Sequence, residues 1–577
     1  MRPAWVWVML VGCGGLPVGI EAAGTTTSGT TTSATKTATA TTSTTDSTPT
    51  SGSETGTSTG GDDSSTGEQC VDGSERPCFD GPPGSEPVAP CKRGIQVCDF
   101  LGDWGPCFGD VLPELQDCAT AQDETCSGAG PTCAGGQKWL RASSITADTR
   151  WGGAIGASAL AIAADGDIVA TGTYQGTLQF GADLHTSGGD ADIWVARFAP
   201  DGAPKWFRRF GEELDPWAGY SGAPWSAGNI AFAANGDILV TSNCVEAIDF
   251  GFGPLTGEEH DPVALRMTAG GQVKWAHRYV GLAGSEGIDY PMYIAPAAND
   301  RVWLVGTLYG GSADLGGAVL YSAGWGDVVL AQLDAAGEHL WSRRAGDTGH
   351  QQVGAIATAA GGGLVITGSV EGTLDLGGGP LVSAGKSDTW LALLDPDGAQ
   401  VWARRDGDNF NQSGARLHVD GTGGILLAGH FESTIDLGGG SLGPPPGHTW
   451  SRAIFLAKFA PGGTHLWSTA LGHDDDDLWA SSLALGPDGT IVLGGQGPLH
   501  EVFTGDVWDV GDGSWIATLD ATGTPRWLHD LGSSTRAVVA SDGSVIASFD
   551  IYDMAQFAGV TVGAPGVASL VLGNYGP

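Results

Sequence analysis

One tryptophan motif recurs seven times along the 577 residues, and it constrains the fold more than any other feature of the sequence. Each copy has Lys, Leu, Val or Arg before the tryptophan, and six of the seven have Arg or His within three positions after it. The tryptophans are Trp139, Trp206, Trp275, Trp341, Trp402, Trp467 and Trp527. Successive spacings of 67, 69, 66, 61, 65 and 60 residues define a repeat, which indicates one supersecondary unit copied along the chain.

Within each repeat, the residue pattern predicts four short strands and two tight turns. In the fifth repeat, residues 415–419, 425–430 and 453–459 have the alternating or apolar character of strands, and the Trp467 strand follows them. A loop is expected after residues 435–438. Asp-Gly and Asn-Gly pairs, such as Asp165-Gly166, supply the positive φ angles that tight hairpin turns require.

The two ends of the repeat array predict how it closes. The array begins with a lone Trp139 strand, and its last repeat lacks a tryptophan strand. An open stack would leave two exposed strand edges, whereas in a closed ring the Trp139 strand completes the final unit. We therefore predict an all-β fold, in which residues 136–577 form a seven-bladed β-propeller of four-stranded blades.

The N-terminal residues predict export from the cell. A single charge, Arg2, precedes an apolar run over residues 4–11 that is too short to cross a bilayer. Residues 10–13, Leu-Val-Gly-Cys, resemble the bacterial lipobox, which implies a signal peptide over residues 1–12 and a lipid-modified Cys13. The alternative is an ordinary signal peptide that is cut near Ala22 or Ala23. The lipobox implies a location in the cell envelope, either anchored to the outer membrane by lipid or extracellular.

Two further segments precede the propeller. Residues 13–67 are predicted to form a disordered stalk, because residues 24–67 are almost entirely Thr, Ser, Gly and Ala. Residues 68–135 contain eight cysteines, which predict a small module held by up to four disulfides with open pairing. A zinc site is less favoured because the segment lacks Cys-x2-Cys pairs. These cysteines are Cys70, Cys78, Cys91, Cys98, Cys107, Cys118, Cys126 and Cys133.

Several segments resemble known families. The run from Cys70 to Cys78, together with Trp104-Gly-Pro-Cys107, resembles the cysteine-rich module of myxobacterial surface lipoproteins. The Asp375-Leu376-Gly377 type of segment resembles the bacterial β-propeller repeats of large surface proteins. The Asp-x-x-Gly-x-x-x-Trp turns more weakly resemble the PQQ-like repeats of an outer-membrane-assembly lipoprotein and of quinoprotein dehydrogenases. Quinoprotein catalysis implies adjacent cysteines, whereas the propeller region has only Cys244, which is expected to be a buried or free thiol.

The charge balance disfavours two kinds of partner. The chain has 26 basic and 65 acidic residues, a net charge of −39, which disfavours binding to nucleic acid or to an anionic membrane through charge. Twelve of the basic residues lie within three positions of the repeated tryptophans. They could form cationic sites for acidic ligands. Charges repeated in most blades are better explained as protection of the outer edge strand.

Two acidic segments are candidates for ligand or metal binding. Asp474, Asp475, Asp476 and Asp477 form the densest charge run of the repeats, and the loop that carries them is either a ligand site or solvated surface. The segment from Asp406 to Asn411 begins like an EF-hand loop, but Phe410 occupies a ligand position and no glutamate ends the loop. These departures leave calcium possible but not predicted, and no other cofactor is predicted. Zinc-peptidase chemistry is excluded because no His-Glu-x-x-His motif occurs.

These features favour a binding role over catalysis, although they leave an enzyme open. We expect a monomeric, lipid-anchored surface protein whose propeller presents loops to a protein or glycan ligand. The alternatives are a propeller hydrolase or lyase that acts on glycans through a carboxylate pair, and a scaffold for envelope assembly. An enzyme would require polar residues that break the sevenfold pattern and converge on the channel.

Overall fold

The computed structural model describes two units of the chain. The first comprises Met1–Glu114 and Glu124–Gly128, and the second comprises Leu115–Asp123 and Ala129–Pro577. The described residues are 74–78, 94–97, 137–146, 154–188, 192–211, 229–244, 247–257, 261–281, 292–444, 451–472, 477–503, 506–510, 513–551, 555–557, 560–562 and 568–576.

The described part of the first unit is a small antiparallel hairpin. Its strands are β1 (Glu75–Cys78) and β2 (Gly94–Val97), and Cys78 pairs with Gly94 in the ladder. Cys13, the Thr/Ser-rich segment and the other seven clustered cysteines lie outside the described residues. Lipidation, the stalk and the disulfides therefore stay predictions.

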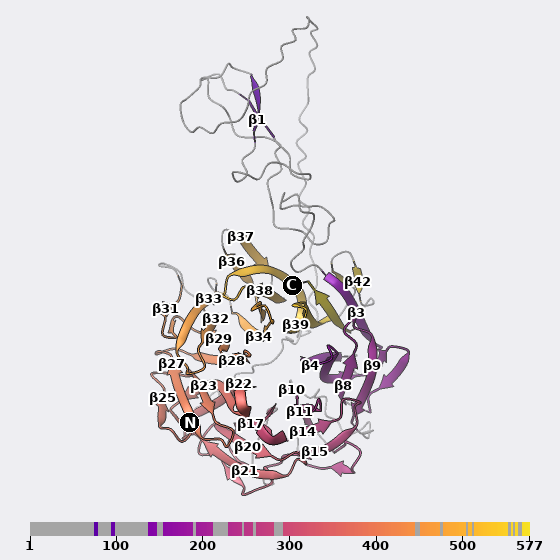
Figure 1. Ribbon diagram of the computed structural model, residues 1–577, viewed down its shortest axis with the longest axis vertical. Coiled ribbons are helices and arrows are strands. Elements are labelled where there is room, and N and C mark those ends of the chain that lie inside the picture. The colour runs from indigo at the N-terminus through magenta and orange to yellow at the C-terminus, as the bar shows by residue number, and fades with distance from the viewer. Residues whose placement is uncertain are drawn as a thin grey trace, which may run out of the picture. The chain divides into compact units, whose positions relative to one another are not determined.

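The second unit is a seven-bladed β-propeller, as predicted (Figure 1). Five blades are separate four-stranded antiparallel sheets whose strands run in chain order from the channel outward. Blade 1 contains β4 (Ala154–Ile162), β5 (Ile168–Gln175), β8 (Asp192–Phe198) and β9 (Pro204–Phe210); blade 2 contains β10 (Ile230–Phe232), β11 (Ile238–Cys244), β14 (Asp261–Met267) and β15 (Val273–Arg278); blade 3 contains β16 (Tyr293–Pro296), β17 (Val302–Leu308), β20 (Asp327–Leu333) and β21 (His339–Ala345); blade 4 contains β22 (His350–Thr358), β23 (Leu364–Glu371), β26 (Asp388–Leu394) and β27 (Gln400–Asp406); blade 5 contains β28 (Gln412–Val419), β29 (Ile425–Phe431), β32 (Ala453–Phe459) and β33 (His465–Leu471).

The last two blades share one strand, and the N-terminal strand closes the ring. Blade 6 contains β34 (Trp479–Leu485), β35 (Ile491–Gln496), β38 (Ser514–Leu519) and the first half of β39 (Pro525–Val539). The second half of β39 is the first strand of blade 7, followed by β40 (Val545–Ile551) and β43 (Ser569–Tyr575). The fourth strand of blade 7 is β3 (Gln137–Thr146), which pairs with β43. The predicted closure by the Trp139 strand is therefore confirmed.

The connection between the second and third strands is more ordered than the sequence pattern predicted. The expected loop after residues 435–438 is a two-stranded hairpin, and a hairpin occupies this place in all seven blades. Asp436 stabilises its turn because one carboxylate oxygen accepts hydrogen bonds from the amides of Gly438 and Gly440. The hairpins are β6 (Thr177–Phe180) with β7 (Asp183–Thr186), β12 (Ile248–Asp249) with β13 (Pro254–Leu255), β18 (Ser312–Ala313) with β19 (Leu320–Tyr321), β24 (Thr373–Asp375) with β25 (Pro380–Val382), β30 (Ile435–Asp436) with β31 (Ser441–Leu442), β36 (Leu499–Phe503) with β37 (Asp506–Val510), and β41 (Ala555–Phe557) with β42 (Val560–Val562).

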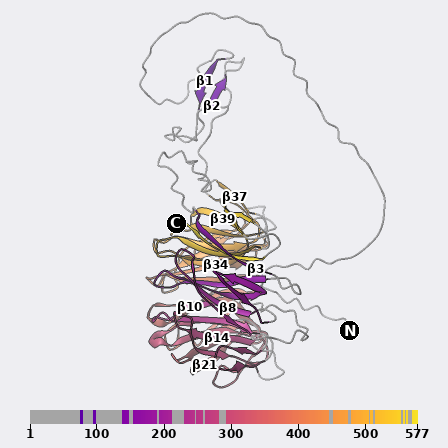
Figure 2. The same cartoon turned by 90° about the vertical axis from the view of Figure 1, so that its right-hand side faces the viewer.

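The ring has two faces that carry different connections between strands. The strands run roughly along the ring axis, so their ends reach opposite faces (Figure 2). One face, here called the turn face, carries the tight turns between first and second strands and between third and fourth strands. The other, called the loop face, carries the seven hairpins and the connections between blades. This division follows from the antiparallel order of the strands.

The core lies between the blades, where apolar side chains of adjacent sheets meet. One cluster joins Trp303 and Val305 of blade 3 to Ile366 and Trp390 of blade 4. The only helices among the described residues are the short 3-10 turns η1 (Ala298–Asp300) and η2 (Ala360–Gly362). No helix within the described ranges has the length and apolar character needed to cross a membrane.

Ring closure should depend on the burial of the β3 side chains. Leu140 is 8% exposed and packs with Val571 and Phe549 of blade 7. We expect Leu140→Ala to lower the free energy of unfolding by about 2 to 5 kcal/mol, measured by urea denaturation, because it leaves a cavity where the ring closes. The matched variant Leu184→Ala, at a leucine that is 68% exposed, should change it by less than about 0.5 kcal/mol. Equal effects at the two leucines would contradict the closure described here.

Candidate functional site

The repeated tryptophans join each blade to the next. Three of the indole N–H groups donate hydrogen bonds to the turn between the third and fourth strands of the following blade. The bonds run from Trp206 to the Ala269 carbonyl at 3.2 Å, from Trp275 to the Ala335 carbonyl at 3.2 Å and from Trp402 to the Pro461 carbonyl at 3.0 Å. Their rings also cover a glycine of that turn. At Gly398, which has φ of 90°, an added Cβ would lie 2.6 Å from the Trp341 ring. The tryptophans thus connect adjacent blades of the ring.

The basic residues beside these tryptophans also have partners within the protein. Arg208, Arg343 and Arg404, two positions after a tryptophan, donate to the turn carbonyls of Gly271, Gly398 and Gly463 in the next blade. Arginines three positions after a tryptophan pair with an aspartate at the start of the third strand. These pairs are Arg209–Asp192, Arg278–Asp261, Arg344–Asp327 and Arg405–Asp388. Their repeated role is therefore to fix turns and buried carboxylates, and not only to protect an edge.

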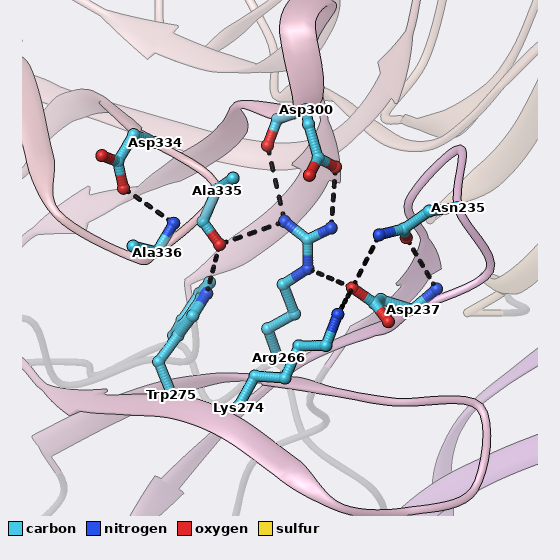
Figure 3. Close-up of polar contacts among 9 residues, drawn as sticks. All are labelled: Asn235, Asp237, Arg266, Lys274, Trp275, Asp300, Asp334, Ala335 and Ala336. Carbon is cyan, nitrogen blue, oxygen red and sulfur yellow. Dashed lines mark hydrogen bonds and ion pairs between the residues drawn. The ribbon is translucent and has the colours of Figure 1, made fainter.

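A further ion-pair network, around Arg266 of the third strand, joins blade 2 to blade 3 (Figure 3). The guanidinium of Arg266, which is 1% exposed, contacts the carboxylates of Asp237 and Asp300 at 2.8 and 2.7 Å. It also donates to the carbonyl of Ala335, which accepts the indole N–H of Trp275 as well. Lys274 completes the network at 2.6 Å from Asp237. The charges of this cluster are used in the scaffold.

The structure does not support a metal site at the segment from Asp406 to Asn411, which was considered for calcium but not predicted to bind it. Both carboxylate oxygens of Asp406 accept hydrogen bonds from Arg404. Asp408 accepts from the Gln412 amide and the Thr434 hydroxyl. Throughout the described ranges, no group of three or more His, Cys, Asp or Glu side chains is arranged to hold a metal ion.

The predicted acidic ligand loop is described only at its end. Asp474, Asp475 and Asp476 lie outside the described residues, whereas Asp477 is 3.8 Å from the Arg452 guanidinium. Cys244 is a buried free thiol, as expected, and burial raises its pKa to about 12. A thiol that holds its proton so tightly is a poor nucleophile at neutral pH.

The sevenfold pattern breaks at one position of the channel wall. This position is the first-strand residue that pairs with the fourth residue of the second strand. In blades 1, 2, 4 and 6 it holds Ala159, Asn229, Ala355 and Ser482. In blades 3, 5 and 7 it holds Tyr293, Arg416 and Arg536. Blades 3, 5 and 7 are spread around the ring, so these three positions lie on three sides of it.

Each of these three side chains bonds to the backbone of the next blade. The Tyr293 hydroxyl donates to the Gly354 carbonyl at 2.7 Å, Arg416 Nε to the Ser481 carbonyl at 2.8 Å and Arg536 Nε to the Ser158 carbonyl at 2.9 Å. The three carbonyls belong to residues skipped by the ladder at β-bulges of the first strands. The bonds hold the phenol and the two guanidinium groups in fixed positions.

The electrostatics of the channel wall are unusual for so acidic a protein. The described first strands contain Arg416 and Arg536 but no Asp or Glu. Burial raises the pKa of Tyr293, and the charges of both arginines act on the same phenol in the opposite direction. Burial also raises the pKa of Asp550, on the second strand of blade 7, to about 8, although Arg536 opposes the shift. Asp550 is therefore mainly protonated at neutral pH.

A neutral histidine lies behind the same wall. His430 accepts a hydrogen bond from the Ala480 amide at 2.8 Å through Nε2, and burial with the charges of Arg416 and Arg452 lowers its pKa to about 3. The sequence pattern did not mark His430, Asp550 or the three channel residues as candidates. Alignment of the first strands would have exposed Arg416 and Arg536, because the other repeats have small or uncharged residues there.

Comparisons with known proteins extend this description only slightly. No family model matches the sequence, and no curated protein matches it. Among solved structures, the chain is similar to BamB from Moraxella catarrhalis, with 12% identity, 75% of this chain and 97% of that chain covered, and a TM-score of 0.32. It is also similar to a puromycin hydrolase, with 14% identity, 69% and 50% coverage and a TM-score of 0.37.

A third similar structure is a point mutant of the NanB sialidase from Streptococcus pneumoniae, with 8% identity, 77% and 70% coverage and a TM-score of 0.30. Likenesses as distant as these carry no argument about activity. The assignment of the chain to the seven-bladed propellers rests on its own strand pairing.

The buried network around Arg266 should contribute to stability. We expect Arg266→Met to lower the free energy of unfolding by about 3 to 5 kcal/mol, because it leaves the buried Asp237 without one of its two cationic partners. Urea denaturation measures the change. The matched variant Arg301→Met removes a solvent-accessible ion pair with Asp397 and should cost less than about 1 kcal/mol. If the two variants lost equal stability, the structural role of Arg266 would be wrong.

The raised pKa of Asp550 predicts a pH-dependent stability. The native state holds this proton more tightly than the unfolded chain, so the contribution of Asp550 to stability is present below about pH 4 and is lost as pH rises to about 8. Asp550→Asn keeps an oxygen acceptor and does not titrate. The stability of the variant relative to the wild type should therefore rise from about pH 5 to about pH 8.5 in urea denaturation. Parallel profiles for the two proteins would contradict a buried, protonated Asp550.

Proposed function

We propose that this protein is a recognition module of the cell envelope, whose propeller binds a protein or glycan at its loop face and does not catalyse a reaction. The N-terminal residues that resemble a lipobox support export and anchoring, and the Thr/Ser-rich segment supports a stalk that extends the propeller away from the membrane. The proposal treats the folded chain as a monomer.

The contrast between the two faces carries this proposal. On the turn face, each of the seven first turns has five residues and the same closing hydrogen bond, from Ala163 N to Asp167 O in blade 1 and from Ala540 N to Ser544 O in blade 7. On the loop face, the connections between blades vary from none within β39 to 19 residues between β9 and β10. Variable connections on a constant scaffold are the usual location of binding residues.

Polar residues that break the sevenfold pattern do occur at the channel wall, as an enzyme would require, but the described first strands lack the carboxylate pair of a glycosidase. A glycosidase requires two carboxyl groups at a fixed separation, but the described first strands contribute no Asp or Glu to the channel. Buried carboxylates elsewhere, such as Asp327 and Asp388, are paired with arginines of the same blade. The loop face also presents Trp325, which is 72% exposed and suited to stacking on a sugar or to an interface contact.

A binding screen with one loop-face variant tests the proposal. The full-length protein is first applied to a glycan array and to envelope extracts. The affinity of each captured ligand is then measured for the wild type, for Trp325→Ala and for Val401→Ala. Val401 is an exposed residue of the outer strand β27, at 58% exposure. We expect saturable binding that weakens by about tenfold or more in Trp325→Ala and is unchanged in Val401→Ala. Conversion of a glycan into product, or equal losses in both variants, would overturn the proposal.

A further inference from the structure

An exposed tryptophan and an exposed carboxylate lie close together on the loop face, where blade 3 meets blade 4. Gly326 pairs with His350, the first residue of β22, and His350 pairs in turn with Glu371, the last residue of β23. Trp325, which precedes Gly326, donates its backbone N–H to the Gly349 carbonyl at 3.2 Å. Because neighbouring strands lie about 4.8 Å apart, the backbones of Trp325 and Glu371 are separated by about 10 Å. Both side chains can therefore contact one small ligand.

The same backbone arrangement recurs where blade 4 meets blade 5, and this recurrence identifies equivalent residues. At the boundary of blades 3 and 4, the Gln351 amide donates to the Gly326 carbonyl at 2.8 Å. One blade later, the Gln412 amide donates to the Ser387 carbonyl at 2.7 Å. The residue before Ser387 is Lys386, so a lysine occupies in blade 4 the position that the exposed tryptophan occupies in blade 3.

The lysine of blade 4 pairs with a carboxylate of the next blade. The register of the first two strands makes Glu432 of blade 5 the equivalent of Glu371. The Glu432 carboxylate accepts hydrogen bonds from the Asn411 side-chain amide at 2.9 and 3.0 Å. It also lies 3.9 Å from Lys386 Nζ. The chain thus supplies its own cation to the carboxylate at this boundary.

The boundary between blades 5 and 6 also contains its own cation. The Arg452 guanidinium lies 3.8 Å from the centroid of the Trp479 ring and 3.8 Å from the Asp477 carboxylate. Such a cation is attracted both by the electron-rich face of the indole ring and by the negative charge. A cation between a tryptophan and a carboxylate is therefore an arrangement that this scaffold can hold.

Where blade 3 meets blade 4, the tryptophan and the carboxylate are present without a cation. Trp325 is 72% exposed, and Glu371 is exposed as well. Among the described residues, the Glu371 carboxylate has no ion pair and accepts no hydrogen bond. His350 does not supply the charge, because burial lowers its pKa and keeps the ring neutral at pH 7. The position is therefore open to a cation from another molecule.

The loop that carries the tryptophan is fixed by internal hydrogen bonds. One oxygen of the Asp327 carboxylate accepts from the Ser322 hydroxyl at 2.6 Å and from the Ala323 amide at 2.7 Å. An added Cβ at Gly324 would lie 2.5 Å from the Thr348 backbone, so the loop packs closely on the connection to blade 4. An aromatic residue on a fixed loop loses little conformational freedom when a ligand binds.

We propose that Trp325 and Glu371 bind a lysine or arginine side chain of a protein ligand, with the cation over the indole ring and paired with the carboxylate. The net charge of −39 attracts a basic partner and disfavours an acidic glycan. The assignment to a protein ligand rests on the recognition function proposed above, whereas the cation site itself does not.

Titration of small cations into the full-length protein tests the site. Blocked tripeptides with a central lysine, arginine or glutamine, and glucosamine as an amine on a sugar, are titrated at constant ionic strength while calorimetry records binding. We expect the lysine or arginine peptide to saturate one site per chain and the glutamine peptide not to bind. Absence of saturable binding for both cationic peptides would overturn the proposal, and so would tighter binding of glucosamine than of either peptide.

Variants at the two residues separate this site from general attraction to an acidic protein. Trp325→Ala and Glu371→Gln should each weaken the cationic peptide by about threefold or more. Trp325→Lys introduces the internal cation that Lys386 provides in blade 4, and it should abolish binding. Val401→Ala and Glu338→Gln, at exposed positions away from the site, are the matched controls and should bind as the wild type does. Thermal denaturation checks that each variant is folded.

The outcomes distinguish the cation site from the recognition function. Peptide binding that is equal in the wild type, Trp325→Ala and Glu371→Gln would refute the site, even if a macromolecule captured in the envelope or glycan screen still depended on Trp325. Peptide binding that depends on both residues, together with no captured macromolecule, would support the cation site and refute the recognition function.

Discussion

The ring depends on one repeated contact. The tryptophan on the fourth strand of each blade packs on the turn between the third and fourth strands of the next blade. This contact recurs from Trp139 on Gly202 to Trp467 on Gly523, and it requires a glycine because the turn has a positive φ and the indole ring leaves no room for a Cβ. The same turn also accepts hydrogen bonds from tryptophan and arginine. One flat side chain thus sets the separation of adjacent blades, which explains why the motif repeats so regularly.

The exception at Trp527 follows from how the ring closes. The next blade is blade 7, whose third and fourth strands are the C-terminal β43 and the N-terminal β3, so no turn connects them. The Trp527 ring packs beside Tyr575 instead, at 6.3 Å between ring centroids, and its buried N–H has no hydrogen-bond partner among the described residues. Ring closure therefore removes one turn contact. The antiparallel pairing of β3 with β43 replaces that contact and holds the ring closed.

Local and repeated signals made the fold predictable. The tryptophan spacing, the glycine turns and the unmatched first strand were sufficient for the number of blades and their closure, because each signal appears several times. The small hairpins were missed since strands of two or three residues, such as β30, are too short to show alternation. The arginines near the tryptophans were assigned to edge protection because their partners are distant in sequence. Arg208 of blade 1, for example, bonds to Gly271 of the adjacent blade 2.

The channel residues could not be predicted because they depend on register. Whether Arg416 faces the next blade is decided by the bulge that shifts the ladder between Gly414 and Arg416, and no local motif marks that shift. Arg536 and Asp550 likewise look like ordinary surface charges until burial is known. In a repeat protein, a charge that recurs in most blades has a carboxylate or turn partner in its own scaffold, as Arg209 and Arg405 do. Arg536, which departs from the repeat, bonds instead to backbone carbonyls of its own blade and of the next blade, and the tryptophan motif gives no sign of these bonds.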